Sequence, residues 1–445
     1  MIRSMTQGSP IKLILAFTVP LLIGNVFQQF YNIADIIIVG RIIGVHALAA
    51  VGATAPVFMA MLGLTIGMAS GFTVIVGQRF GAGDEAGVRR SVAMSAMLSV
   101  GLTLILTIGS VLGMPWIMAV MNISAELYDD SYHYVIIIAY GLIAMMMYNL
   151  LSCICRALGD SRTPLYFLIV SSILNVLLAL LFIIVFGWGV AGSAIALVIA
   201  QAISAIACFC YMRARFPILR LQRQDWSWNS EFAWKHLKLG IPMASQFMII
   251  SFGILAIQSV TNTFGAETIA GFVSATRIEQ LALQPMISFG IAMAVYSAQN
   301  YGAGKYSRIR KGARQCSLVS LGFCAFAAAS MFFYGRELIA LFTAEYDELL
   351  MEQASLYLKY SVPFYFFLGQ IFVFRNALQG MGISSVPLIS SLLELFLRGL
   401  SAFVLAGMWG YLGICYASPI CWIAACLFTT GCYFFVIRHM KKEGR

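Results

Sequence analysis

Long apolar runs are the feature of this sequence that most limits its possible folds. Only 10% of the 445 residues are charged and 61% are hydrophobic, whereas an ordinary soluble domain carries about 25% charged residues. A water-soluble globule is therefore excluded, because its surface would need far more charge. A helix that crosses a bilayer needs roughly 20 residues, so the chain can hold about a dozen spans.

Twelve apolar runs, bounded by Gly, Pro and charged residues, are each long enough to cross a bilayer. They form two groups of six. We predict an all-α polytopic membrane protein with an N-terminal lobe over 1–212, a cytoplasmic linker over 213–236 and a C-terminal lobe over 237–445. The predicted spans are 13–38, 47–77, 91–120, 131–155, 163–187 and 189–212, then 237–262, 268–299, 315–343, 354–379, 385–408 and 410–437.

The charged residues are unevenly distributed between the two ends of these runs. If both termini are cytoplasmic, most of the 28 Lys and Arg residues, Arg375 among them, fall on the cytoplasmic side. Acidic residues such as Glu126, Asp129 and Asp130 fall outside. Such a bias sets the orientation of membrane proteins. The net charge of +10 therefore indicates topology, and we expect no nucleic-acid partner.

The two halves of the chain repeat each other at a nearly constant spacing. The hexapeptide Gln-Arg-Phe-Gly-Ala-Gly at 78–83 recurs 221 residues later as Gln-Asn-Tyr-Gly-Ala-Gly at 299–304, and a basic pair follows each copy. These pairs are Arg89-Arg90 and Arg310-Lys311. Because six helices separate equivalent points, the repeat is parallel, with a pseudo-twofold axis along the membrane normal. Such repeats build secondary transporters.

Asp35 is the most informative polar residue within the apolar runs. An ionised carboxylate inside a helix bundle costs several kcal/mol unless it is paired, protonated or bound to a cation. The polar side of the helix that carries Asp35 could simply hold that helix against neighbouring helices through hydrogen bonds. Alternatively, Asp35 binds a proton reversibly or holds a small cation with nearby amide oxygens. Four amides share its helix face, within an arc of about 120°: Asn25, Gln28, Gln29 and Asn32.

Charged residues of the second half are further candidates. Arg277 and Glu279 are about 200° apart in helical projection, so one should line a cleft and the other the lobe interior. Glu394 and Arg398 have the i,i+4 spacing that favours an intrahelical ion pair. We predict a structural pair, with a gating or substrate-facing role as the alternative. Arg398 is the repeat counterpart of Asn175, so the two lobes differ chemically at matching positions. We therefore expect coupling of transport to an ion in the first lobe only.

Pro20 is a candidate hinge. It lies early in the first span, where a proline removes a backbone donor and allows the helix to bend. A change at Asp35 could then alter the packing of the polar face, and the bend could transmit that change along the helix.

Three motifs stand at span ends. They are the paired hexapeptides, residues 32–35 (Asn-Ile-Ala-Asp) with Gly40, and residues 156–160 (Arg-Ala-Leu-Gly-Asp) with Pro164. Together they resemble the multidrug and toxic compound extrusion (MATE) family, over essentially the whole chain. The resemblance implies two six-helix lobes around a central cleft. It also implies export of organic, often cationic, compounds, driven by inward flow of H⁺ or Na⁺.

The same resemblance sets further expectations. We expect a monomer in the bacterial plasma membrane, with no enzymatic activity, no cofactor and no firm metal site besides the transported ion. Aromatic faces attract organic cations, so aromatic residues could line the cleft. The candidates by helix face and resemblance are Phe27, Tyr31, Tyr140, Tyr148, Phe252 and Phe272.

The residues that the resemblance implies for a cation site match this chain only in part. Asn175 matches an Asn that lines a cation site in some family members, Asp35 matches the acidic centre of that site, and Asn149 adds an amide from the fourth span. Where some relatives have a second Asp and a Thr, this chain has Ala179 and Leu197. A hard cation needs several oxygen ligands, whereas a proton needs one carboxylate. We therefore favour proton coupling, with sodium as the alternative.

Other membrane functions fit the residues less well. A flippase for lipid-linked sugars, the alternative transporter, would need a wide basic cavity for phosphates, and Arg is sparse within the predicted spans. A membrane-embedded transferase would need an acidic metal-binding motif such as DDxxD at the inner face, and the sequence has none. A channel is disfavoured by the transporter-like repeat.

Overall fold

The structure is a computed structural model that describes residues 4–121, 123–340 and 348–442. All regular secondary structure within these ranges is helical. The chain divides into two compact units: unit 1 contains Met1–Ser4 and Pro20–Phe247, and unit 2 contains Met5–Val19 and Met248–Arg445. The first helix of each half therefore contributes to both units, and the first helix of the chain passes from unit 2 to unit 1 at Pro20.

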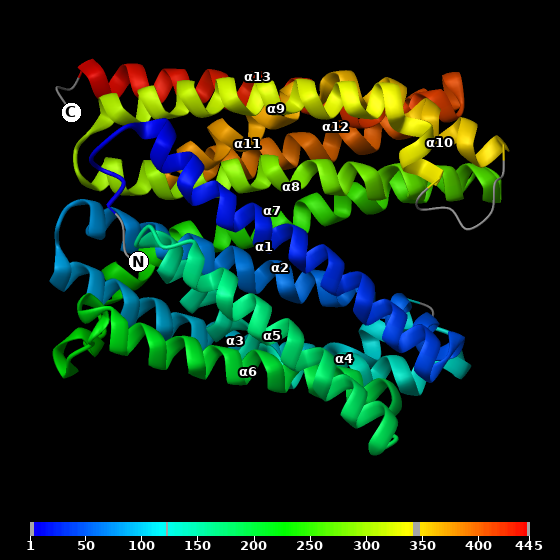
Figure 1. Cartoon of the computed structure of the whole chain (residues 1–445), viewed down its shortest axis with the longest axis horizontal. Helices are drawn as coiled ribbons and strands as arrows, with labels where there is room; N and C mark the ends of the chain where they lie inside the picture. Colours follow the sequence, from blue (N-terminus) through cyan, green and yellow to red (C-terminus); the bar gives the residue numbers. More distant parts are fainter. Residues whose placement is uncertain (1–3, 122, 341–347, 443–445) are drawn as a thin grey trace. The chain divides into compact units, whose positions relative to one another are not determined.

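Unit 1 is built from long helices (Figure 1). Within it, α2 packs mainly against α4, and α4 packs against α6. Short π-helical turns extend α1 and α5. The elements are α1 (Pro10–Ile38) with Val39–Ile43, α2 (Val45–Gly81), α3 (Glu85–Val120), α4 (Ala125–Ala157), α5 (Arg162–Leu180) with Leu181–Val185, α6 (Gly189–Arg215) and the start of α7 (Ser230–Thr261).

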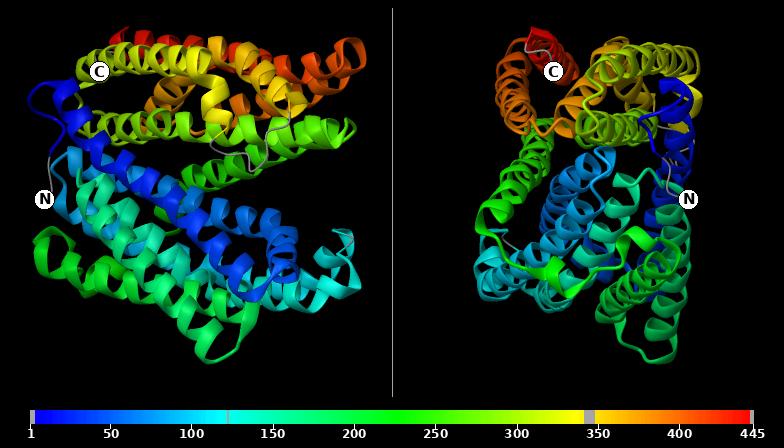
Figure 2. Two further views of the ribbon diagram at one scale, coloured as in Figure 1. Left: turned by 45° about the vertical axis from the view of Figure 1, so that its right-hand side comes forward. Right: turned by 90° about the vertical axis from the view of Figure 1, so that its left-hand side faces the viewer.

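Unit 2 continues with α8 (Ala266–Gly302), α9 (Tyr306–Ala340), α10 (Glu348–Ser361), α11 (Tyr365–Gly380), α12 (Ser385–Trp409) and α13 (Tyr411–Lys442). The two views in Figure 2 agree that α12 and α13 lie side by side. A 3-10 turn, Val362–Phe364, separates α10 from α11. Pro363 lies in this turn, where its missing N–H is tolerated.

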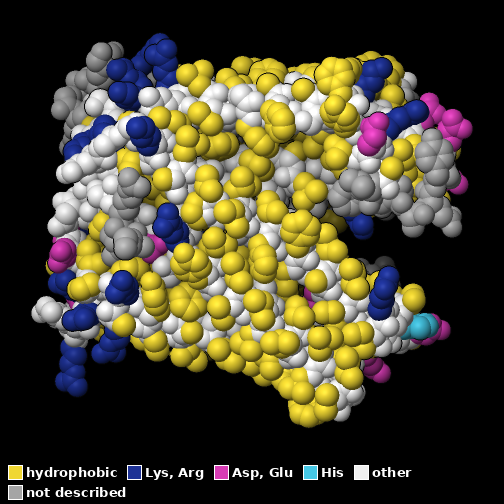
Figure 3. All heavy atoms as spheres, viewed as in Figure 1, with side chains coloured by type: hydrophobic (Ala, Val, Ile, Leu, Met, Phe, Trp, Pro, Cys, Tyr) yellow, Lys and Arg dark blue, Asp and Glu magenta, His cyan; other side chains and the backbone are white. Residues whose placement is uncertain are grey.

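The predicted all-helical, twelve-span fold is confirmed. Eleven helices of the described part are long and apolar enough to cross a membrane. The predicted span 354–379 differs only because the 3-10 turn splits it into α10 and α11. The end of the predicted span 315–343, residues 341–343, lies outside the described residues. On the face in Figure 3, hydrophobic side chains cover most of each unit, and Lys and Arg gather mainly near one end of each.

The repeated hexapeptide ends α2 and α8 in the same way. Gly83 has a φ of 73° and Gly304 a φ of 68°, a left-handed conformation that favours glycine after a helix. The Asp84 N–H then donates to the Arg79 carbonyl at 3.0 Å, and the Lys305 N–H donates to the Asn300 carbonyl at 2.8 Å. The sequence repeat is therefore also a repeat of backbone geometry.

Glycines let α2 and α7 approach closely within unit 1. A Cβ atom added at Gly67 would lie 2.4 Å from the Ala244 Cα, and one added at Gly71 would lie 2.5 Å from the Gly240 Cα. No larger side chain fits there without moving the backbone. Small residues at such contacts allow helices to pack tightly in lipid, where apolar burial between helices contributes little.

Candidate functional site

Asp35 lies in the last turn of α1, next to the π-helical turn Val39–Ile43. Its side chain is half-buried, and its carboxyl makes no hydrogen bond or ion pair with any described residue. The hydroxyls of Tyr31, one turn earlier, and of Tyr134 on α4 lie within electrostatic range. An unpaired carboxylate in a membrane span is costly, so binding a proton or a cation would stabilise Asp35.

A hydrogen bond joins α1 to α5 beside this carboxyl. The Asn175 Nδ2 donates to the Tyr31 hydroxyl oxygen. Asn175 is buried, and its Oδ1 accepts no hydrogen bond from the described residues. Tyr31 precedes Asp35 by four residues, so the two side chains lie on the same face of α1. Sequence reasoning assigned Tyr31 to substrate; the i,i+4 spacing to Asp35 was the signal for this second role.

The other amides predicted to join Asp35 are not linked to it. Asn149 is half-buried and donates from Nδ2 to the Met145 carbonyl of its own helix at 2.9 Å, so its bond stays within α4. The four amides on the polar face of α1 divide evenly: Gln28 and Asn32 are exposed, and Asn25 and Gln29 are half-buried.

Four charged side chains are buried together in unit 2: Glu279 on α8, Arg375 on α11, and Glu394 and Arg398 on α12. Arg375 Nη1 donates to Glu394 Oε1 at 3.1 Å. The Tyr357 hydroxyl donates to Glu279 Oε2 at 2.8 Å. Arg398 lies within electrostatic range of both carboxylates. Two positive and two negative charges balance, so this cluster can remain ionised in a low-dielectric interior.

Glu394 thus makes its close ion pair with Arg375 rather than with Arg398 of its own helix, which interacts with Glu394 at longer range. Contact between α11 and α12 instead brings Glu394 to Arg375. The Arg398 Nε has no hydrogen-bond partner among the described residues, and its guanidinium interacts with Cys421 of α13. Sequence reasoning placed Arg375 at the cytoplasmic surface because it is close to the end of an apolar run. Arg375 is only 5% exposed, and nothing in its local sequence signals the pairing.

Arg277 and Glu279 point in different directions, as their spacing predicts. Arg277 is exposed, whereas Glu279 is buried in the interior of unit 2. Of the two, only Glu279 belongs to the buried charge cluster.

The aromatic candidates separate into two groups. Tyr148 and Phe272 lie in the hydrophobic cores of their units, and the Phe272 ring packs edge-on against Tyr357 with centroids 5.2 Å apart. Both rings are therefore packed within these cores. Tyr140 and Phe252 are exposed, and Phe27 is half-buried.

Asp160 organises the turn between α4 and α5. Its carboxyl accepts hydrogen bonds from the Arg162 N–H at 3.0 Å, from the Thr163 N–H at 3.1 Å and from the Thr163 hydroxyl at 2.8 Å. Burial by itself would raise the pKa of Asp160, but hydrogen bonds to the ionised form outweigh it and the pKa is lowered. The Arg-Ala-Leu-Gly-Asp motif is thus explained by the geometry of a helix start.

The halves repeat each other as sets of membrane-spanning helices, and the first holds a carboxylate without a partner among the described residues; together these features define a multi-span membrane transporter. The sequence model of the MatE family matches the chain twice, over residues 20–181 and again over 242–404. The chain belongs to this family, MATE, whose members are transporters and not enzymes. No group of three or more His, Cys, Asp or Glu side chains in the described part could hold a metal ion.

Relatives support the same conclusion. The chain is 27% identical over 393 residues to the probable multidrug resistance protein YpnP of Bacillus subtilis, which covers 87% of this chain and 86% of that protein. It is also 27% identical over 438 residues to the probable multidrug resistance protein YoeA of Bacillus subtilis, with 96% and 94% covered. A crystal structure of MATE in the bent conformation shares the fold, with a TM-score of 0.92 at 23% identity over 99% of this chain and 98% of that one.

Proposed function

We propose that this transporter exports organic, mainly cationic, compounds across the bacterial plasma membrane in exchange for protons, with Asp35 as the coupling carboxylate. The observation that carries this proposal is the half-buried Asp35 carboxyl, which has no partner among the described residues. A group in this situation changes its charge readily, and intramembrane carboxylates of this kind serve proton relays in transporters. The names of the Bacillus subtilis relatives, probable multidrug resistance proteins, support the class of substrate.

The transport cycle we propose is alternating access, with the repeated halves 1–212 and 237–445 as its lobes and both termini in the cytoplasm. In the outward-open state a proton binds Asp35 and the compound leaves. In the inward-open state the proton leaves and a new compound binds. Tyr31 would act as a positioning residue, because its hydroxyl proton can stabilise the ionised Asp35 while its oxygen accepts from Asn175.

Sodium is the alternative coupling ion. Its support is the Asn175 Oδ1, a buried acceptor that no described donor satisfies. The same amide binds the Tyr31 hydroxyl, which lies within electrostatic range of Asp35. Carboxylate, amide and hydroxyl oxygens are the ligands that hard cations prefer.

Proteoliposomes separate these possibilities. Transport of a fluorescent organic cation would be driven by an imposed pH gradient or, separately, by a sodium gradient, in wild type and Asp35→Asn. We expect the pH gradient to drive transport in wild type and Asp35→Asn to abolish that dependence. Asp130→Asn is the matched control, because Asp130 is exposed. If Asp35→Asn transports with full gradient dependence, the central assignment is wrong; transport driven by sodium alone would favour the alternative ion.

We also propose Pro20 as the hinge of α1. Its support is that Pro20 lies inside the helix and is the residue at which α1 passes from unit 2 to unit 1. Pro20→Ala restores a backbone donor and should stiffen the helix, so we expect slower transport at unchanged substrate binding. Pro242→Ala, the repeat counterpart in α7, is the comparison variant. Unchanged transport and coupling in Pro20→Ala would exclude the hinge.

A further inference from the structure

The basic pair that follows each repeated hexapeptide has a different environment in the two units. In unit 1, Arg89 Nε lies 3.5 Å from Asp225 Oδ2, and the Arg90 guanidinium lies 5.4 Å from the centroid of the Phe232 ring. Both cations are therefore compensated by the chain itself, through the segment between α6 and α7 and the first turn of α7.

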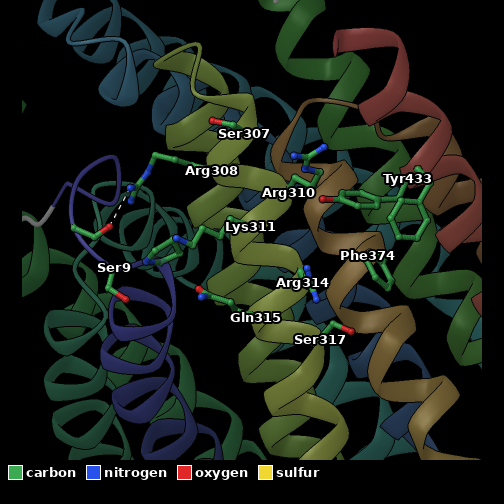
Figure 4. Close-up of a pocket in the computed structure, with 13 residues that line it drawn as sticks. Ser9, Ser307, Arg308, Arg310, Lys311, Arg314, Gln315, Ser317, Phe374 and Tyr433 are labelled. Carbon is green, nitrogen blue, oxygen red and sulfur yellow. Dashed lines mark hydrogen bonds between the residues drawn. The ribbon is translucent and has the colours of Figure 1, made fainter. Parts of the chain in front are cut away.

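The counterparts in unit 2, Arg310 and Lys311, lie on the wall of a cavity instead (Figure 4). The cavity has a volume of about 1010 Å³, within the range that holds a small organic ligand. It is formed by the first turns of α9, the segment Gly8–Pro10, and residues of α11 and α13. Its position near the start of α9 places it at one end of the membrane-spanning bundle of unit 2.

This cavity carries an uncompensated positive charge. Arg310, Lys311 and Arg314 are exposed, and none of the ion pairs formed by the described residues includes them. Arg308 also lines the cavity, but it is held by the chain: its Nη1 donates to the Gly8 carbonyl and its Nε to the Asn300 Oδ1, each at 3.0 Å. Three cations thus remain available to a ligand. The first turn of a helix adds to the positive potential.

Two buried polar groups of the cavity wall also lack partners. Tyr433 is only 1% exposed, yet its hydroxyl makes no hydrogen bond with a described residue. In Figure 4, Arg310 lies on the side of α9 that faces Tyr433. The Gln315 Oε1 is likewise buried without a donor. Buried polar atoms are normally satisfied, so an unpaired hydroxyl that Arg310 faces indicates a missing acceptor.

We propose that this cavity binds the phosphate headgroup of an anionic phospholipid. Arg and Lys side chains are the usual ligands of phosphate oxygens, and basic pockets at the membrane surface bind such headgroups. Phe374 and Phe434 complete the wall with apolar rings, which suit the glycerol and first acyl carbons of a lipid better than a free phosphate. The proposal is independent of the coupling mechanism, because neither Asp35 nor Asn175 lines the cavity.

Native mass spectrometry of the full-length protein in detergent can test this proposal. The protein would be titrated with phosphatidylglycerol, with phosphatidylcholine of the same acyl chains, and with inorganic phosphate. We expect phosphatidylglycerol to bind about tenfold more tightly than phosphatidylcholine, and the triple variant R310Q/K311Q/R314Q to lose about tenfold of that affinity. Tyr433→Phe, which removes only the hydroxyl, should lose a smaller factor of about threefold.

The matched control is R213Q/R215Q/R220Q, which removes the same charge from exposed positions of unit 1 and should keep wild-type lipid affinity. Equal affinity of the R310Q/K311Q/R314Q variant and of this control for phosphatidylglycerol would overturn the site. Tight binding of inorganic phosphate, lost in the R310Q/K311Q/R314Q variant but without a preference between the two lipids, would overturn the lipid assignment. Thermal unfolding of each variant checks that folding is preserved.

Discussion

The two units share one repeated pattern but treat charge within the membrane in opposite ways. In unit 1, Asp35 has no partner among the described residues, and Asn175 supplies only an amide. In unit 2 the counterpart of Asn175 is Arg398, which belongs to a cluster of two cations and two carboxylates. Binding of a proton or cation at Asp35 therefore changes the net charge buried in unit 1, whereas the buried charge cluster of unit 2 is already neutral. A shared backbone can thus hold one half with an unpartnered carboxylate and one half whose buried charges are balanced.

The largest expected effect is on the stability of unit 2. Glu394→Gln leaves the buried Arg375 without its ion-pair partner, so we expect the free energy of unfolding to fall by about 3–5 kcal/mol. Thermal unfolding in detergent measures this loss. The double variant R375M/E394M removes both charges and should regain most of the stability. A wild-type unfolding temperature in Glu394→Gln would contradict a structural role for this pair.

Asp35→Asn should produce the reverse pattern. Because Asp35 has no ionic partner to lose, we expect unchanged or higher stability, but the proton-driven accumulation of substrate should vanish. One coupled charge is worth about 2.3 kcal/mol per 100 mV, or roughly fiftyfold in the concentration ratio. Accumulation of a fluorescent cation in energised proteoliposomes measures this ratio. A large drop in unfolding temperature would instead indicate that Asp35 is structural.

Removal of one phenol hydroxyl in each unit sharpens the comparison. Tyr357→Phe deletes the hydrogen bond to the buried Glu279, and we expect a loss of about 2 kcal/mol of stability. Tyr31→Phe removes the group that accepts from Asn175 and should mainly slow transport and shift its pH profile. Both are measured by thermal unfolding and by transport against pH. If Tyr31→Phe loses as much stability as Tyr357→Phe and leaves the pH profile of transport unchanged, the role of Tyr31 is structural.

The smallest expected difference concerns the two basic pairs. Arg89→Gln breaks a largely buried pair with Asp225, whose side chain is 6% exposed, and should cost about 1 kcal/mol of stability. Arg310→Gln in lipid-free detergent should cost less than about 0.5 kcal/mol, because an exposed unpaired charge contributes little. Thermal unfolding at low ionic strength measures both. A larger loss of stability in Arg310→Gln than in Arg89→Gln would show that Arg310 has a structural partner.

The helices were predictable because bilayer crossing requires long apolar segments, and such segments are visible locally. As far as the structure describes them, all twelve predicted runs correspond to helical segments, and the glycines that end α2 and α8 could be recognised from the repeat. The break between α10 and α11 was less evident, although Pro363 was its local signal. Helix ends extend past the apolar runs because backbone hydrogen bonding continues where side chains become polar, as at the start of α9.

Within the candidate site, residue type identified Asp35 and Asn175 because polar residues in an apolar span are rare and costly. Residue type could not identify their connection through Tyr31, since a tyrosine on an apolar helix fits substrate contact or packing equally well. Glu394 was selected as a charged residue within an apolar span, but its partner was assigned by spacing on the same helix.

The sequence by itself determined the helical membrane fold, the parallel repeat and the scarcity of charge that limits where coupling can occur. These properties follow from short-range preferences and from partition between water and lipid, which each segment expresses alone. Only the tertiary structure decided that Arg375 pairs with Glu394, that Tyr31 joins Asn175, and that Arg310 and Lys311 line a cavity while Arg89 meets Asp225. Electrostatic pairing depends on distances between helices that are far apart in sequence, and packing sets those distances.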